Sequence, residues 1–409
     1  MAYNKKKNYM IIAILAFANT AVYGIPCMKM QFYDIMLSAW GYSHTQLSGL
    51  YSIYGIVCMG AYLAGGFLAD AFPAKKIMIT ALIASGILHF LTLTQPSYFV
   101  LSIIFALLGI TSVMAFYPAS MKILSCMQNE KESNGIVFGI YVAIVNIVNI
   151  CIAIYGIYVL NNFKENVVVF RSMIIVYGVM HFGAALLILV LFKNQAEDDE
   201  KNSIEFKELP QLICNKNLWL VVVIVFCNYL LQSTMVYVIP YFSNIYHMSE
   251  SAVLIFSILR VNITTIIIAP FSGKITDIWN SATKLIKYTF VVAGILMFAI
   301  IGSLCTEMPV GVLMLLVLGV NAICIAGKTV NLVTINEIGI SKEIRGTAIG
   351  LVSFLGYSSD AFYYSYAGSC LDHYQTTGYF IIFMTFVVCC AIGYFACSKL
   401  EKLMKKSFL

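Results

Sequence analysis

Charged residues are scarce in this chain of 409 residues: aspartate, glutamate, lysine and arginine together make up 11%, against 61% hydrophobic residues. A soluble domain of this composition would expose large apolar patches and aggregate, so a soluble protein is excluded. Lipid as the solvent removes the difficulty, because a helix of about 20 apolar residues crosses the hydrocarbon core of a bilayer. The sequence therefore predicts an all-α membrane protein.

Signatures of ATP-driven and metal-binding proteins are also missing. The sequence contains no GxxxxGK[ST] loop, which argues against a pump that hydrolyses ATP itself. Its 12 cysteines lie singly apart from Cys389 and Cys390, without a CxxC or Cys/His spacing, so we expect them to be packing residues. No nucleophile–base pair appears in the apolar segments. We therefore expect no enzyme activity, no cofactor, no metal and no nucleic-acid partner.

Hydrophobic runs separated by polar residues predict twelve spans, six on each side of a polar segment. The expected spans are 9–36, 46–69, 77–94, 98–126, 134–160 and 168–192, then 218–246, 250–272, 284–304, 309–334, 346–370 and 375–397. The sequence thus predicts an N-terminal six-helix bundle over 1–192, a cytoplasmic linker over 193–216 and a C-terminal six-helix bundle over 217–409.

Two landmarks recur in both halves at nearly the same offset. A glycine and an aspartate four residues later close the second span at 66–70 and the eighth span at 273–277. A GxxxG pair opens the fifth span at 135–139 and the eleventh at 346–350. This repetition predicts two pseudo-symmetric bundles, an arrangement that transporters use to alternate access around a central site.

Most of the 25 basic residues fall in the loops on one side of the predicted spans, and Lys164 and Arg171 are the basic residues of the other side. Basic loop residues stay in the cytoplasm. Both termini are therefore predicted to be cytoplasmic, with the first span retained in the mature protein.

Four ionisable residues lie within apolar spans: Lys29, Arg260, Lys328 and Asp360. A charge at mid-membrane costs roughly 2.5–3.5 kcal/mol on insertion scales, so such groups usually face a cavity, a partner or a ligand. Three cations against one anion favour an anionic substrate. The alternatives are that Lys29 reaches the outer interface, and that Asp360 forms a permanent ion pair with Lys328 rather than coupling transport to a proton or sodium.

Polar residues on neighbouring spans extend the candidate substrate site. Tyr229 and Gln232 lie in the seventh span, and Tyr357 lies in the eleventh, too deep for tyrosines of an interfacial belt. By contrast, His89 and His181, in the third and sixth spans, are interpreted as packing or interfacial residues.

The stretch 66–76, read as GFLADAFPAKK, resembles the loop between spans two and three of the major facilitator superfamily. The resemblance implies a twelve-helix fold, and it assigns conformational gating to this loop and its repeat, through Gly66, Asp70, Gly273 and Asp277. Two features of the loop differ, because Ala71 and Pro73 replace the family's arginine and second glycine.

Within that superfamily the chain resembles the organophosphate:phosphate antiporter and anion:cation symporter branches, on 42–70 and on 346–357. The branch implies that Lys29 holds the substrate anion. Gln232 lies in the stretch where phosphate antiporters carry an arginine, which disfavours phosphate-ester exchange.

These observations predict a secondary transporter, monomeric by resemblance, in a bacterial cytoplasmic membrane. Its substrate would be a small organic anion: a carboxylate, a sugar acid, or a phosphate or sulfonate ester. Symport with a proton or sodium is expected. The alternative is a permease for a neutral sugar, nucleoside or drug-like molecule, in which the cations are structural.

Overall fold

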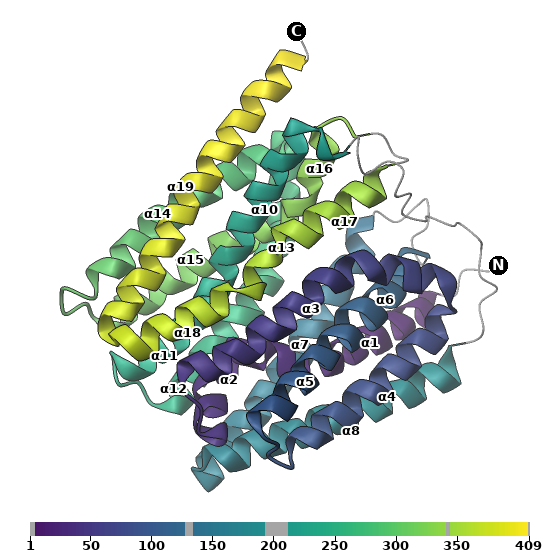
Figure 1. Cartoon of the computed structure of the whole chain (residues 1–409), viewed down its shortest axis with the longest axis vertical. Helices are drawn as coiled ribbons and strands as arrows, with labels where there is room; N and C mark the ends of the chain where they lie inside the picture. The colour runs from purple at the N-terminus through teal and green to yellow at the C-terminus, as the bar shows by residue number, and fades with distance from the viewer. Residues whose placement is uncertain (1–4, 127–133, 193–211, 341–343, 408–409) are drawn as a thin grey trace. The chain divides into compact units, whose positions relative to one another are not determined.

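The computed structural model describes residues 5–126, 134–192, 212–340 and 344–407, and in these ranges every regular element is a helix (Figure 1). Ten described helical segments are long and apolar enough to cross a membrane, and the bent pair Asn8–Val22 and Gly24–Trp40 adds an eleventh. A helix satisfies its main-chain N–H and C=O groups within its own segment, as lipid requires. The predicted all-α membrane fold is confirmed.

The chain divides into two compact units. The first consists of Met1–Gly41 and Gly60–Ser203, and the second consists of Tyr42–Met59 and Ile204–Leu409. The segment 42–59, from the predicted second span, is thus grouped with the C-terminal part of the chain. The sequence boundaries of the two bundles stay predictions, and residues 193–211 of the predicted linker lie outside the described residues.

The helices of the N-terminal part follow the predicted spans with two interruptions. They are α1 (Lys5–Val22), α2 (Gly24–Trp40), α3 (His44–Ala71), α4 (Ala74–Thr92), α5 (Tyr98–Gly109), the π-helical turn η1 (Ile110–Phe116), α6 (Tyr117–Cys126), α7 (Asn134–Phe163) and α8 (Asn166–Leu191).

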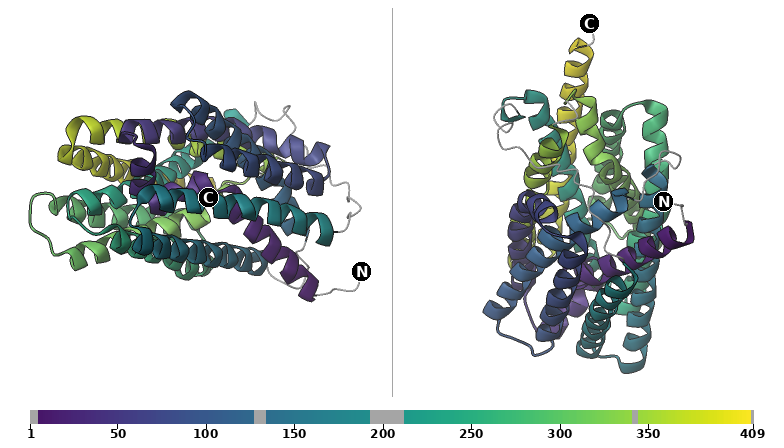
Figure 2. Two further views of the ribbon diagram at one scale, coloured as in Figure 1. Left: turned by 90° about the horizontal axis from the view of Figure 1, so that it is seen from below. Right: turned by 90° about the vertical axis from the view of Figure 1, so that its right-hand side faces the viewer.

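The C-terminal part contains more short elements. They are α10 (Lys216–Thr234), η3 (Met235–Tyr237), α11 (Val238–Asn244), α12 (Glu250–Ile258), η4 (Leu259–Ile263), α13 (Thr264–Trp279), α14 (Ala282–Gly302), α15 (Val310–Val330), η5 (Asn331–Val333), α16 (Thr334–Glu337), α17 (Arg345–Gly356), η6 (Ser358–Ala361), α18 (Tyr363–Tyr374) and α19 (Thr376–Ser407). Helix α19 packs on α10 and α14, and its last turns, in yellow, project beyond them (Figure 2).

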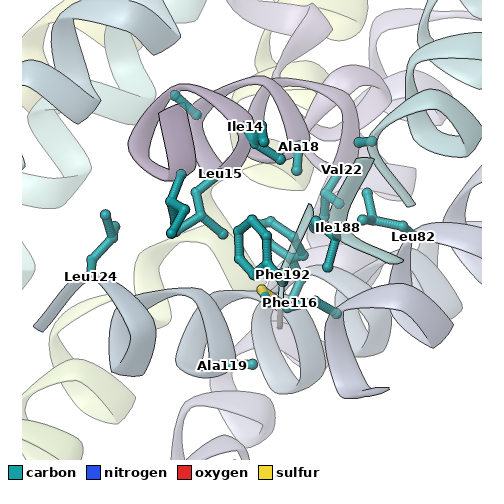
Figure 3. Close-up of a cluster of buried hydrophobic side chains, with 14 of the residues drawn as sticks. Ile14, Leu15, Ala18, Val22, Leu82, Phe116, Ala119, Leu124, Ile188 and Phe192 are labelled. Atoms are coloured by element: carbon teal, nitrogen blue, oxygen red, sulfur yellow. The ribbon is translucent and has the colours of Figure 1, made fainter. Parts of the chain in front are cut away.

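An apolar cluster fills the interior of the first unit, where α1, α4, α6, α7 and α8 meet (Figure 3). Leu15 of α1, Phe116 of η1 and Ile188 of α8 are each fully buried in it. Because lipid tails are as apolar as these side chains, close packing rather than exclusion of water favours this contact.

The first predicted span is broken near its middle, where α1 and α2 meet at a bend of 60°. Pro26 has no N–H to donate to Val22, so the hydrogen-bond ladder is interrupted there. Gly24 leaves room for the Tyr177 ring, because a Cβ at this position would lie 2.6 Å from the ring carbons. The bend therefore depends on a proline and on a glycine packed against α8.

The predicted span 346–370 is also discontinuous. Helix α17 ends at Gly356, the 3-10 turn η6 follows, and α18 begins at Tyr363. The residues at the two joints have non-helical backbones, with φ −93° and ψ 5° at Tyr357 and φ −135° and ψ −27° at Phe362. The break places Asp360 on a short turn between two half-helices.

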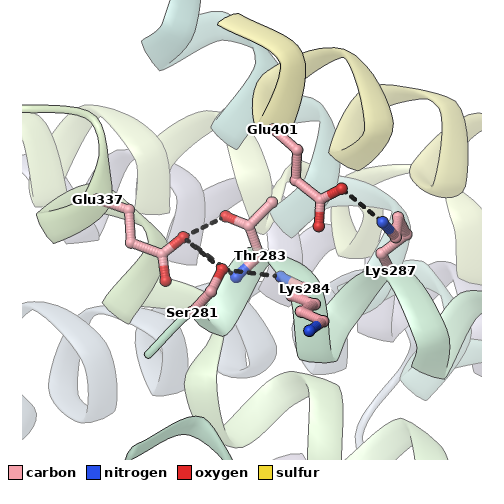
Figure 4. A network of polar contacts seen from close by, with 6 residues as sticks. All are labelled: Ser281, Thr283, Lys284, Lys287, Glu337 and Glu401. Atoms are coloured by element: carbon pink, nitrogen blue, oxygen red, sulfur yellow. Dashed lines mark hydrogen bonds and ion pairs between the residues drawn. The ribbon is translucent and has the colours of Figure 1, made fainter. Parts of the chain in front are cut away.

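A polar network fixes α14 near the predicted cytoplasmic end of the second unit (Figure 4). Glu337 accepts hydrogen bonds from the main-chain N–H groups of Ala282 and Thr283 and from the Thr283 hydroxyl. A carboxylate at the start of a helix is favoured by the helix dipole. Lys287 and Glu401 form an ion pair between α14 and α19.

Candidate substrate site

Three elements far apart in the sequence bring polar side chains together in the second unit. Helix α10 carries Tyr229 and Ser233, η6 carries Asp360, and α15 carries Lys328. The spacing between Tyr229 and Ser233 is one helical turn, so both project from the same face of α10. The structure thus unites Tyr229, Lys328 and Asp360, which the sequence had nominated separately.

The carboxylate of Asp360 is held by hydroxyl groups. The Ser233 hydroxyl donates to Oδ1 at 2.7 Å, and the Tyr229 hydroxyl donates to Oδ2 at 3.2 Å. The Tyr364 hydroxyl, on α18, interacts with both Ser233 and Asp360. Hydrogen bonds to an ionised group are shorter and stronger than those between neutral groups, so Asp360 organises the cluster.

Tyr229 also connects Asp360 with Lys328. The ammonium group of Lys328 lies 5.6 Å from the centre of the Tyr229 ring, a cation–π distance. On another side the Tyr229 ring packs against Tyr357, with the ring centres 4.6 Å apart. Lys328 is exposed, whereas Tyr229, Tyr357 and Asp360 are half-buried. A cation, a carboxylate and two aromatic rings are therefore accessible to a ligand at one place.

Gln232 lies on α10 next to this cluster in the sequence, and its Nε2 atom is buried without a hydrogen-bond partner. A buried amide nitrogen without an acceptor costs about 1–3 kcal/mol. A bound ligand that supplies an acceptor would remove this cost. The buried amide nitrogen therefore agrees with the predicted substrate role of Gln232, which stays a prediction.

Arg260 is almost completely buried, with 1% of its surface exposed. It lies in the π-helical turn η4, and its Nη1 donates to the carbonyl oxygen of Met235 at 3.1 Å. The side-chain amide of Asn321, on α15, donates to the carbonyl of Arg260 itself. These contacts tie η3, η4 and α15 together, and the predicted anion-binding role of Arg260 is not tested by them.

Several polar residues of the cluster escaped the sequence reasoning. Ser233 and Tyr364 were not nominated, and neither was the buried pair Asn228 and Asn331, in which Asn228 donates to Asn331 at 2.9 Å. The signal available for Ser233 was its position one turn after Tyr229 on a predicted helix. Tyr364 is recognisable as a tyrosine of the predicted eleventh span, but its place beside Asp360 depends on the break between α17 and α18.

Lys29 belongs to the first unit and lies on α2, five residues after the start of that helix, with 4% of its surface exposed. Its burial argues against the alternative of a lysine that reaches the outer interface. Contact with a substrate anion stays a prediction.

His89 and His181 face each other in the first unit, with ring centres 4.3 Å apart and no exposed surface. Their Nδ1 atoms donate to the carbonyl oxygens of Ser85 and Tyr177. The Nε2 atom of His89 accepts the main-chain N–H of Ile25 at 3.3 Å, directly after the bend between α1 and α2. His89 therefore stabilises the bend, which agrees with the interpretation of both histidines as packing residues.

The predicted gating residues lie at helix ends. Gly66 and Asp70 lie in the last turns of α3, and the side chain of Asp70 lies outside the described residues. Lys122 donates to the carbonyl oxygen of Ala69 at 3.2 Å, next to Asp70. Gly273 and Asp277 lie on α13, and Asp277 is exposed. Their gating function stays a prediction.

The helical fold and the polar residues inside its spans are those of a membrane transporter. The chain matches the sequence model described as Major Facilitator Superfamily over residues 9–364 and therefore belongs to that family. It is a multi-pass membrane transporter for a small molecule and not an enzyme. The superfamily expected from residues 66–76 is confirmed, whereas the finer branch is not.

Among its relatives is the inner membrane protein YihN of Escherichia coli K12, with 26% identity over 389 residues, 92% of this chain and 91% of the relative. The nucleoside transporter NupG has a similar structure, with a TM-score of 0.75 at 14% identity, over 97% of this chain and 99% of NupG. A bacterial homologue of the lysosomal transporter Spinster gives a TM-score of 0.71 at 13% identity, over 98% of each chain. The structural likenesses concern the fold alone.

Proposed function

We propose that the protein moves a small organic anion across the bacterial inner membrane by alternating access, in symport with a proton or sodium. The observation that carries the proposal is the position of Lys328, an exposed cation inside a predicted span, above the ring of Tyr229 and linked through it to Asp360. A lysine held at this depth is costly unless it has an anionic ligand or partner.

The proposed cycle begins when the anion meets Lys328 in the second unit, and Lys29, in the first unit, keeps its predicted role as a substrate contact. The Tyr357 ring and the Gln232 amide nitrogen, which is buried without a hydrogen-bond partner, orient the uncharged part of the anion. Attraction between the anion and the cations lowers the energy of the occluded state, and the loops with Gly66, Asp70, Gly273 and Asp277 then rearrange. The substrate class includes carboxylates, sugar acids and phosphate or sulfonate esters, in agreement with the anion branch of the superfamily.

The cellular setting is part of the same proposal. The name of YihN places that relative in the inner membrane, and the distribution of lysine and arginine puts both termini of this chain in the cytoplasm. We propose a monomer, as the family resemblance implies.

One observation favours a second candidate substrate class. NupG is a nucleoside transporter by name, and the Tyr229 and Tyr357 rings suit stacking against a base or a sugar ring. With a neutral substrate, Lys328 and Asp360 would only balance each other's charge.

A thermal-shift screen of the purified protein separates the two classes, since a ligand that binds the native state raises the melting temperature. The probes are D-glucuronate, glycerol 3-phosphate and uridine. We expect an anion to raise the melting temperature of the wild type, and Lys328→Gln to lower its affinity about tenfold, which corresponds to about 1.4 kcal/mol. A shift with uridine that Lys328→Gln leaves unchanged would refute the anion proposal.

A further inference from the structure

Asp360 lies on the turn that interrupts the predicted eleventh span, between the half-helices α17 and α18. Discontinuous helices at mid-membrane are typical of coupling-ion sites, because the interruption leaves polar groups free to bind an ion. The hydrogen bonds around its carboxylate indicate which coupling ion Asp360 binds.

We propose that Asp360 binds the coupling proton, rather than sodium, and that Tyr229 links its protonation to anion binding beside Lys328. The second half of this inference rests on the proposed function, and the first half does not. Both halves follow from the chemistry of the residues that touch Asp360.

The groups around the carboxylate suit both protonation states. A hydroxyl group is both donor and acceptor. Ser233 and Tyr229 donate to the ionised carboxylate, and after rotation of its hydrogen Ser233 accepts the proton of the neutral acid. Binding a proton therefore requires no loss of hydrogen bonds and no movement of a helix.

A sodium ion is poorly served by the same groups. Sodium requires several oxygen atoms whose lone pairs converge on one point. Here the hydroxyl oxygens of Ser233 and Tyr229 lie beside different carboxylate oxygens, Oδ1 and Oδ2, so they do not converge on one point. Sites for hard cations in proteins usually combine carboxylates with carbonyl oxygens, whereas the partners of the Asp360 carboxylate among the described side chains are hydroxyl groups.

Tyr229 carries the electrostatic connection to the substrate. Its hydroxyl touches Asp360, and its ring faces the Lys328 ammonium. When Asp360 is ionised, its negative charge partly compensates Lys328. When Asp360 is protonated, this nearby negative charge is lost, and Lys328 attracts an anion more strongly. By thermodynamic reciprocity the bound anion then strengthens proton binding at Asp360 by the same factor. Proton and anion therefore bind together, which gives symport.

Besides Lys328, the titratable side chains that the described contacts place near Asp360 are phenols, and they do not compete for this proton, because an unperturbed tyrosine loses its proton only near pH 10. Tyr229 and Tyr364 touch the carboxylate, and Tyr357 packs against Tyr229, while Tyr237 of η3 and Tyr51 of α3 neighbour Tyr364.

Infrared spectroscopy of the protein in liposomes tests the proton site without any substrate. We expect acidification to produce the C=O stretching band of a protonated carboxyl group in the wild type. With acidification that stops above the depressed pKa of Asp372, the band should be smaller by one carboxyl in Asp360→Asn. It should be unchanged in the matched control Asp372→Asn, which removes an exposed carboxylate that stays ionised under these conditions. Equal bands in the wild type and Asp360→Asn, or suppression of the difference band by NaCl but not by KCl, would overturn the assignment.

The link through Tyr229 is tested by repeating the titration with D-glucuronate or glycerol 3-phosphate, whichever gives the larger thermal shift. We expect the bound anion to raise proton affinity at Asp360 about tenfold in the wild type. Tyr229→Phe keeps the ring but removes the hydroxyl, and it should reduce this shift, measured with the anion at saturation so that a weaker anion affinity does not change the result. A full shift in Tyr229→Phe would refute the link. If neither anion binds, the proposed substrate class fails, while the substrate-free band still decides the proton site.

Discussion

The two units each contain a polar centre, and the two centres are built from different partners. Around Asp360 the partners are side-chain hydroxyls, which can reverse their hydrogen bonds. Around His89 the partners are main-chain groups, the carbonyl of Ser85 and the N–H of Ile25. Main-chain groups cannot reverse donor and acceptor. The first centre therefore accommodates a change of charge, and the second serves to hold one backbone geometry.

The largest expected effect comes from forcing apart the backbones beside Asp360. A Cβ on Gly55 of α3 would lie 2.5 Å from the main-chain carbon and oxygen of Asp360, and backbone atoms cannot move aside as a flexible side chain can. We expect Gly55→Val to destabilise the protein by about 3 kcal/mol and to disturb the Asp360 centre. The measurement is the melting temperature of the purified protein.

The same substitution at Gly60 is the matched control, because Gly60 lies on the same helix and a Cβ there would meet nothing within 4 Å. Equal melting temperatures for Gly55→Val and Gly60→Val would show that α3 does not depend on this close approach.

The second effect concerns the histidine centre. His89→Leu removes the hydrogen bond between the Ile25 N–H and His89 Nε2, and the loss of such a bond costs about 0.5–1.5 kcal/mol. His181→Phe should cost less, because the Nε2 atom of His181 has no hydrogen-bond partner and a phenyl ring keeps the packing against His89. Urea or heat unfolding of both variants measures the difference. A larger loss for His181→Phe than for His89→Leu would contradict the role given to His89.

The smallest effect is expected at the exposed end of α18. The carboxylate of Asp372 accepts the main-chain N–H groups of His44 and Thr45, at 3.1 Å and 2.7 Å, where α3 begins. Partial burial alone would raise the pKa of Asp372, but these hydrogen bonds outweigh burial and lower it below 3.8. Because the folded-state pKa is depressed, the stabilisation is present above the unfolded pKa and is lost as the pH falls through the folded value.

Asp372→Asn should therefore cost at most about 1 kcal/mol at neutral pH, reduced by solvent screening, and nothing in strong acid. Melting temperatures of wild type and variant between neutral and acidic pH provide the measurement. A difference that grows on acidification would have the wrong sign.

Much of this protein can be predicted from its sequence. The scarcity of charge and the length of the continuous apolar runs determine an all-helical membrane fold, because a helix of such residues satisfies its backbone hydrogen bonds within one segment. The stretch 66–76 identifies the superfamily. The four ionisable residues inside the spans stand out for the same reason, since a charge in lipid is too costly to occur by chance.

Only the tertiary structure decided how those charges are partnered. The sequence suggested a direct pair of Lys328 and Asp360, whereas the structure places Tyr229 in contact with both. The position of Tyr229 could not be predicted from the sequence, because the rotation of α10 and the break at η6 are set by packing between helices distant in the sequence. A sequence determines which groups must escape lipid, but the three-dimensional packing of helices determines which groups meet.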